Sequence, residues 1–166
     1  LLSKLVGTKQ QPLWPLLSRK TLSLSVSMAS TTLVAIRFIA YMAHFVAALL
    51  FLLSRRDNLV VALKLDYTAD EYNAADASAI GACFLYMLAF VVQAIAFFGG
   101  FTIFSTPLSL WHTACHIAGG VLLSLVVILK SHYAYVWYIW AFFSAFPMTL
   151  DIYSMVEVLL LRKRKW

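Results

Sequence analysis

Four polar side chains stand inside long apolar runs of the sequence: His44, Gln93, His116 and Asp151. A charge or an imidazole in hydrocarbon is costly, so each such group needs a partner or a purpose. Imidazoles can relay protons or ligate haem iron, and a buried carboxyl group can accept a hydrogen bond from a histidine or carry its own proton. The chemistry open to these residues depends on which segments hold them and whether those segments meet.

The composition is that of a membrane protein. Apolar residues make up 63% of the 166 residues and charged residues 12%, against about 45–50% and about 25% in a typical soluble domain. These values argue against a soluble enzyme and against a disordered chain. The 13 Lys and Arg residues gather toward the ends of the chain, which is typical of membrane topology and gives no reason to expect nucleic acid as a partner.

Helix geometry predicts four crossings of the bilayer. A span needs about 20 apolar residues, whereas the uncharged run from Ala77 to Leu129 would be about 80 Å long as one helix. That run must fold back, and Gly99-Gly100 with Ser105-Thr106-Pro107 supply the turn residues. We therefore predict an all-α membrane protein of four antiparallel transmembrane helices, with spans at about 33–53, 79–98, 108–129 and 134–161.

Two residues perturb these spans. Arg37 lies one turn into the first span, where its long side chain can snorkel to the interface. Pro147 interrupts the fourth span, so we expect a kink there and a free carbonyl near Phe143.

The basic residues also set the expected orientation. The positive-inside rule places both termini and the 99–107 turn in the cytosol and the other two loops outside. The tail can bind anionic lipid headgroups or act as a stop-transfer anchor. Residues 1–27 contain no Asp or Glu, and we interpret them as a non-native or targeting prefix that is disordered, ahead of a domain over 28–166. The lipid-binding residues of the tail would be Arg162, Lys163, Arg164 and Lys165.

The loop after the first span carries a helix-start signal. Thr68-Ala69-Asp70-Glu71 fits the capping box, in which the threonine hydroxyl and the glutamate carboxylate each accept from the other's backbone amide. The second helix should therefore begin near Ala69, as a short capped segment outside the membrane before the second span.

The depth of the polar residues suggests that they cluster. His44 lies about 17 Å into span one, His116 about 12 Å into span three and Asp151 about 18 Å into span four. With Gln93 they could form a structural polar cluster that orients the helices. The alternatives are an organellar inner-membrane subunit that binds haem through His44 and His116, or a small proton or solute carrier that uses Asp151.

Small residues on span three indicate close helix packing. Cys115 and Gly119 form one small-xxx-small pair, and Gly120 and Ser124 form another. We expect them to pack against spans two or four, with a homo-oligomer seam as the alternative. Motifs of metalloproteases, phosphate-binding loops and serine hydrolases are missing from the sequence, so we predict no catalytic residue, no metal and no cofactor.

An ordered set of short motifs runs through the sequence: Ser54-Arg55-Arg56-Asp57-Asn58, Leu65-Asp66-Tyr67-Thr68-Ala69-Asp70-Glu71-Tyr72 with Asp76, Thr113-Ala114-Cys115-His116, Trp137-Tyr138-Ile139-Trp140, Ser144-Ala145-Phe146-Pro147 and the basic tail. Together they resemble the transmembrane protein 107 family from about Met28 to Trp166.

The resemblance implies a tetraspan, non-enzymatic scaffold of the ciliary transition zone membrane, which acts in ciliogenesis and in gating ciliary membrane protein composition. The implied partners are membrane proteins and coiled-coil or C2-domain proteins of the Meckel-syndrome module, together with membrane lipids. For partner contact we predict the first loop, at Asp66, Tyr67, Thr68, Glu71 and Tyr72.

Overall fold

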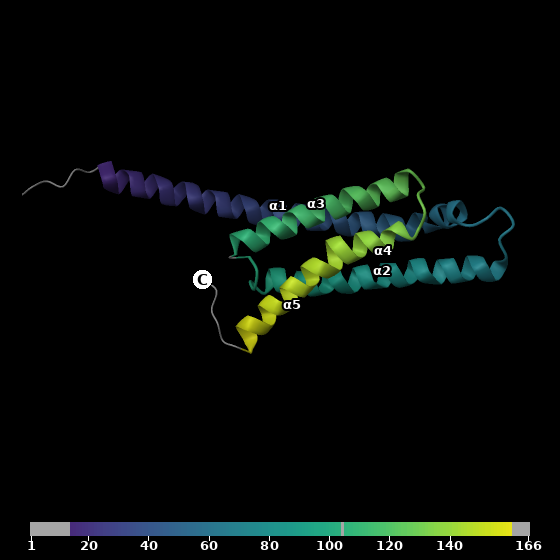
Figure 1. The fold of residues 1–166 in the computed structure, drawn as a ribbon. Helices are drawn as coiled ribbons and strands as arrows, with labels where there is room; N and C mark the ends of the chain where they lie inside the picture. Colours follow the sequence, from purple (N-terminus) through teal and green to yellow (C-terminus); the bar gives the residue numbers. More distant parts are fainter. Residues whose placement is uncertain (1–13, 104, 161–166) are drawn as a thin grey trace, which may run out of the picture. The chain divides into compact units, whose positions relative to one another are not determined.

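The computed structural model describes residues 14–103 and 105–160, with side chains described from residue 31 onward. The described residues are helical and contain no strand (Figure 1). Four segments are long and apolar enough to cross a membrane: Thr31–Ala62, Ala69–Phe98, Thr106–Ile128 and Tyr135–Leu159. The predicted all-α class with four spans is therefore confirmed. The elements are α1 (Trp14–Ala62), α2 (Ala69–Phe98), α3 (Thr106–Ile128), α4 (Tyr135–Trp140), the π-helix η2 (Ala141–Ala145) and α5 (Phe146–Leu159).

The chain divides into two units, residues 1–32 and residues 33–166. The first unit contains the beginning of α1, so helix covers residues 14–27 of the prefix that we expected to be disordered. Residues 1–13 lie outside the described residues, as do residues 161–166 with the basic tail. The predicted headgroup contacts of the tail therefore stay a prediction. The second unit contains the helical bundle.

The capping box at the start of α2 forms as predicted. The Glu71 amide donates to the Thr68 hydroxyl at 3.3 Å, and the Thr68 amide donates to the Glu71 carboxylate at 2.8 Å. From Ala69 the helix continues without a break to Phe98, over 30 residues. That is about 45 Å of helix against about 30 Å of hydrocarbon, so the capped segment is the outer end of one continuous helix.

Ionic and amide contacts tie the outer ends of the helices together. Arg55 Nε lies 2.7 Å from Asp76 Oδ1, which joins α1 to α2 beyond the apolar part of each span. Asn58, fully buried, donates from Nδ2 to the carbonyls of Val126 at 2.8 Å and Ser131 at 2.7 Å. One asparagine on α1 thereby holds the end of α3 and the loop that follows it, and it shares the Val126 carbonyl with the amide of Ser131.

The second turn has the chemistry that the sequence indicates. Gly100 has a φ of 76°, the left-handed region that favours glycine. Pro107 lies in the first turn of α3, where its missing N–H costs nothing. Between them the turn folds back on the bundle, so that Thr102 is fully buried.

The fourth span contains a π-helical turn where we expected a kink. At η2 the Phe146 amide donates to the Ala141 carbonyl, five residues back. Pro147 follows within the first turn of α5 and has no N–H to give to the Phe143 carbonyl four residues back. A wider turn at this place absorbs the residue that cannot continue the α-helical bond pattern.

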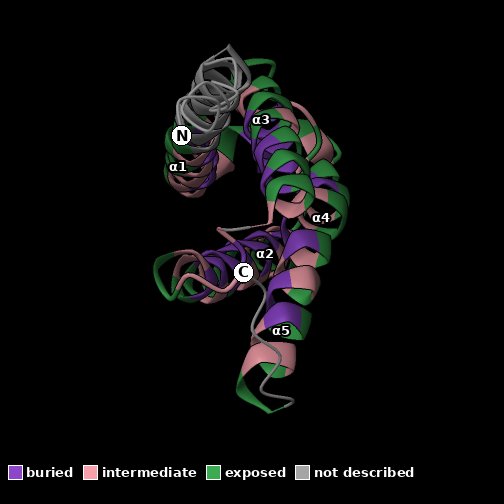
Figure 2. Ribbon diagram, turned by 90° about the vertical axis from the view of Figure 1, so that its left-hand side faces the viewer, coloured by how far each residue is buried: buried purple, intermediate pink, exposed green. Residues whose placement is uncertain are grey.

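The core of the bundle is built from small and aromatic side chains. Ala47 and Ala48 of α1 and Ala79 and Ala82 of α2 are buried, and such residues let helix backbones approach closely. In Figure 2 the buried positions lie on the faces that α2, α3 and α4 turn toward one another, and exposed positions lie on the outer faces. Larger side chains fill the space between the alanines: Phe51, Tyr86, Phe90, Leu123 and Ile139.

Candidate functional site

The polar interior of the bundle has two histidines in direct contact. His44 on α1 and His116 on α3 are 0% and 2% exposed, and their Nδ1 atoms lie 3.3 Å apart. Phe90 lies 5.2 Å from the His44 ring and 6.3 Å from the His116 ring, centroid to centroid. The sequence-based expectation that these two residues meet holds in the structure.

Two glycines explain how the histidines come so close. A Cβ atom at Gly119 would lie 2.5 Å from His44 Cε1 and 2.8 Å from Phe143 Cβ, and one at Gly120 would lie 3.2 Å from His44 Cα. Only glycine leaves room for α1 and η2 at this point on α3. The predicted internal packing of span three is therefore present: it is directed at span four, as expected, and also at span one, which we did not expect.

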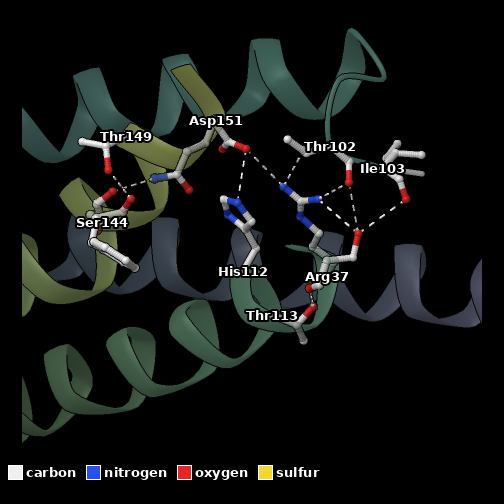
Figure 3. A network of polar contacts seen from close by, with 11 residues as sticks. Arg37, Thr102, Ile103, His112, Thr113, Ser144, Thr149 and Asp151 are labelled. Atoms are coloured by element: carbon white, nitrogen blue, oxygen red, sulfur yellow. Dashed lines mark hydrogen bonds and ion pairs between the residues drawn. The ribbon is translucent and has the colours of Figure 1, made fainter. Parts of the chain in front are cut away.

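Asp151 does not join the histidine pair. Its Oδ1 lies 3.2 Å from His112 Nε2 and 3.8 Å from an Arg37 guanidinium nitrogen, and all three side chains are buried. Figure 3 shows the Asp151 carboxylate between His112 and Arg37. Our expectation that Asp151 reaches His44 or His116 is wrong, because α5 brings the carboxylate to the preceding turn of α3, four residues before His116.

Arg37 is buried in the bundle and does not snorkel to the interface. It is 3% exposed and donates to the Thr102 hydroxyl at 3.0 Å and to the Ser109 hydroxyl at 3.3 Å. Its guanidinium also lies 5.3 Å from the centre of the Phe97 ring. The folded-back turn and the carboxylate of Asp151 together provide the polar partners that headgroups would otherwise supply (Figure 3).

Gln93 contacts the irregular turn of the fourth span. Its Nε2 donates to the Ser144 carbonyl at 3.0 Å, within η2. The sequence predicts a free carbonyl near Phe143, and the glutamine bonds the carbonyl of the next residue. Gln93 therefore anchors α2 to the π-helical turn, and its amide makes no direct hydrogen bond to His44, His116 or Asp151.

Sequence reasoning missed His112 and the inward direction of Arg37. His112 precedes His116 by four residues, so a helix places both on one face, and that spacing could have identified it. Arg37 gives no such signal, because a charge near a helix end fits an interfacial site equally well. The role of Thr102 and Ser109 depends on how the turn folds back, which no local pattern indicates.

The histidine pair does not fit a haem. Bis-imidazole ligation needs two nitrogens about 4 Å apart, each about 2 Å from the metal on opposite faces of a porphyrin. The Nδ1 atoms are 3.3 Å apart, and the α3 backbone at Gly119 closes over the His44 ring. Within the described part of the chain, no group of three or more His, Cys, Asp or Glu residues could hold a metal ion.

The first loop has a defined conformation. Thr68 and Glu71 are engaged with each other in the capping box, and Tyr72 is partly buried and stacks on Tyr67 with ring centres 6.0 Å apart. Asp66, Tyr67, Thr68 and Glu71 are exposed, and partner contact at this loop stays a prediction. The loop is therefore a defined surface rather than a flexible strand of polar residues.

An open apolar groove runs between α1 and α3. It measures about 490 Å³, and Gly120 and Ser124, the second small-residue pair, are among the residues that line it. The first pair, Cys115 and Gly119, is buried. Gly120 is buried as well, and the predicted homo-oligomer seam on span three stays a prediction.

Comparison with known proteins gives one consistent family. The family model for TMEM107, a transmembrane protein, matches residues 33–155. Transmembrane protein 107 of Rattus norvegicus and that of Mus musculus are each 32% identical over 132 residues, which cover 80% of this chain and 94% of the relative. The Homo sapiens protein of that name is 30% identical over the same shares. No solved structure matches the chain.

Proposed function

Because the chain belongs to the transmembrane protein 107 family, we propose that it is a non-enzymatic scaffold in the membrane of the ciliary transition zone. In this role it helps to assemble the Meckel-syndrome module, supports ciliogenesis and restricts which membrane proteins enter the cilium. The observation that carries the proposal is the family match over residues 33–155, which includes nearly the whole four-helix unit.

The interior of the bundle supports a structural role. Arg37 is bound by the turn and by Asp151, Gln93 bonds the π-helical turn, and His44 bonds His116. These contacts link α1, α2, α3 and the fourth span to one another. Polar contacts of this kind fix helix register and orientation in a membrane, where apolar packing alone discriminates poorly.

The outer hairpin of α1 and α2 supports partner binding. The ends of these helices extend past the apolar parts of the spans and are held by the Arg55–Asp76 ion pair and the capping box. The loop between them exposes Leu65 fully and Tyr67 in part. A rigid, protruding surface with exposed apolar and acidic groups suits contact with the extramembrane part of a neighbouring protein. With cytosolic termini, this hairpin faces outside.

The test is the location and activity of the tagged full chain in ciliated cells that lack their own transmembrane protein 107. We expect a ring at the base of the cilium, restored ciliogenesis and restored retention of other transition-zone membrane proteins. A double variant with Leu65→Asp and Tyr67→Ala should insert normally and lose that retention, whereas the control Asn73→Ala, an exposed position on the same hairpin, should behave as wild type. An even distribution over the plasma membrane without rescue would contradict the proposal.

The buried Asp151 favours a second candidate, a small proton or solute carrier. A carboxylate between an arginine and a histidine inside a membrane bundle is also an arrangement found along ion pathways. Flux through liposomes that contain the full chain distinguishes the candidates. Flux above that of empty liposomes, lost in Asp151→Asn, would support the carrier. Flux through liposomes with the full chain that equals the flux through empty liposomes would support the scaffold.

A further inference from the structure

A small cavity, lined by both polar and aromatic side chains, borders Gln93 and His116. Its volume is about 10 Å³, and its lining includes Arg37, Tyr41, Gln93 and His116 together with phenylalanine rings. A cavity of this size holds about one water molecule, provided that two or more polar groups face it.

Gln93 needs a donor inside this cavity. The carbonyl of Ser144 can only accept, so the Gln93 group that bonds it at 3.0 Å must be the amide nitrogen. That fixes the orientation of the amide and turns Oε1 to the other side. Oε1 is buried without a hydrogen-bond partner among the described residues, on a side chain that is 1% exposed. An acceptor left unpaired in this setting is destabilising.

His116 needs a partner at its second ring nitrogen. Nδ1 faces His44, and among the described residues no hydrogen bond is formed by Nε2 of this ring, which borders both the cavity and the open groove between α1 and α3. The nearest carboxylate, Asp151, contacts His112 and Arg37, so neither imidazole of the pair has a counter-ion and both are neutral. In a neutral pair with Nδ1 atoms 3.3 Å apart, one Nδ1 carries the proton and the other accepts it.

The surroundings of His44 decide which ring donates. Its Nε2 is buried without a partner, against Gly119 and Phe143. A bare acceptor is tolerated in such a place more often than an unpaired N–H. His44 therefore carries its proton on Nδ1 and donates to His116 Nδ1, which leaves the proton of His116 on Nε2 and in need of an acceptor.

We propose that the cavity binds one ordered water molecule, which accepts from His116 Nε2–H and donates to Gln93 Oε1. With this molecule a single directional hydrogen-bond chain crosses the bundle, from His44 on α1 to His116 on α3, through water to Gln93 on α2, and on to the Ser144 carbonyl in η2. Every one of the four spans contributes one member. The water is thus a structural ligand that links the histidine pair to the irregular turn of the fourth span.

The test is nuclear magnetic resonance of the full chain in lipid nanodiscs, labelled with ¹⁵N at histidine and glutamine. We expect a protonated Nδ1 on His44, a protonated Nε2 on His116, and magnetisation transfer from water to the His116 Hε2 proton. The reverse tautomers, or protonation of both nitrogens of either ring, would overturn the proposal, as would the absence of water transfer at His116. His132, an exposed loop histidine, is the control for fast exchange with bulk water.

Two variants separate the water from the direct contacts. Ala94 also lines the cavity, so Ala94→Val should fill it, abolish water transfer to His116 and leave the Gln93 bond to Ser144 in place. Gln93→Leu removes both the acceptor for the water molecule and the hydrogen bond to Ser144, and it should abolish water transfer as well. Unchanged transfer in Ala94→Val would contradict the site, and the tautomer measurement on the wild-type chain stands even where Gln93→Leu does not fold.

Discussion

Replacing Gly119 by alanine is the sharpest perturbation of the contact between α1 and α3. The new Cβ would lie 2.5 Å from His44 Cε1, 2.8 Å from Phe143 Cβ and 2.9 Å from His44 Nε2. Favourable carbon–carbon contacts are about 3.5–4.0 Å, so the helices must separate by about 1 Å at this point. The His44–His116 contact, already 3.3 Å long, cannot survive that movement unless both rings rotate.

The expected cost follows from two opposing effects. Overpacking of this kind destabilises by about 1–3 kcal/mol, and the loss of a buried imidazole contact adds about 1 kcal/mol. Against these, alanine favours a helix over glycine by about 1 kcal/mol. We therefore expect Gly119→Ala to lower the free energy of unfolding by about 1–3 kcal/mol.

Gly81 on α2 is the matched control, because a Cβ there meets nothing within 4 Å. Gly81→Ala should stabilise the protein by about 0.5–1 kcal/mol through helix propensity alone. The assay is reversible unfolding of the full chain in nanodiscs, measured for both variants and for Gly119→Ala combined with His44→Ala. The second substitution removes the ring that clashes, so the cost of Gly119→Ala should shrink in that background. Equal effects of Gly119→Ala and Gly81→Ala would refute the described packing.

Three further perturbations test other parts of the bundle. Asp151→Asn should lower the free energy of unfolding by about 3–5 kcal/mol in the same assay, because it leaves the charge of Arg37 buried without its counter-ion; part of that loss should return when Arg37→Met is added, and no recovery would argue against their pairing. Asn58→Ala should cost about 1–3 kcal/mol by removing the two hydrogen bonds that its amide donates to the carbonyls of Val126 and Ser131, and hydrogen exchange should accelerate at residues 126–131, whereas unchanged exchange would contradict the contact. Thr68→Ala should cost about 1 kcal/mol and speed exchange only in the first turn of α2, with exchange in α3 as the internal reference.

Much of the fold was predictable because local physics sets it. The apolar run from Ala77 to Leu129 exceeds any single crossing, so a turn had to interrupt it, and the glycine pair with Pro107 locates that turn. The start of α2 was predictable to the residue, since the capping box needs only side chains three positions apart. The disturbance at Pro147 was predictable in place, and its form as a π-helical turn was not.

The candidate site was predictable only in part, because depth in the bilayer does not specify which face of a helix meets which neighbour. His44 and His116 share a depth and do meet, at 3.3 Å. Asp151 has a similar estimated depth, yet α5 turns it to Arg37 and His112. A residue count along each helix gives the depth of a side chain in the bilayer. It leaves undetermined the rotation of the helix about its own axis and the angle at which two helices cross.

By itself the sequence determined that this is an all-α membrane protein with four segments long and apolar enough to cross a bilayer, and that its second helix begins at a capping box. These properties depend on hydropathy, spacing and caps, which act over a few neighbouring residues. Only the tertiary structure decided that Arg37 lies inside the bundle and that Gly119 admits His44. Those outcomes depend on helix rotation and on a turn that folds back, and both arise from packing between residues distant in the chain.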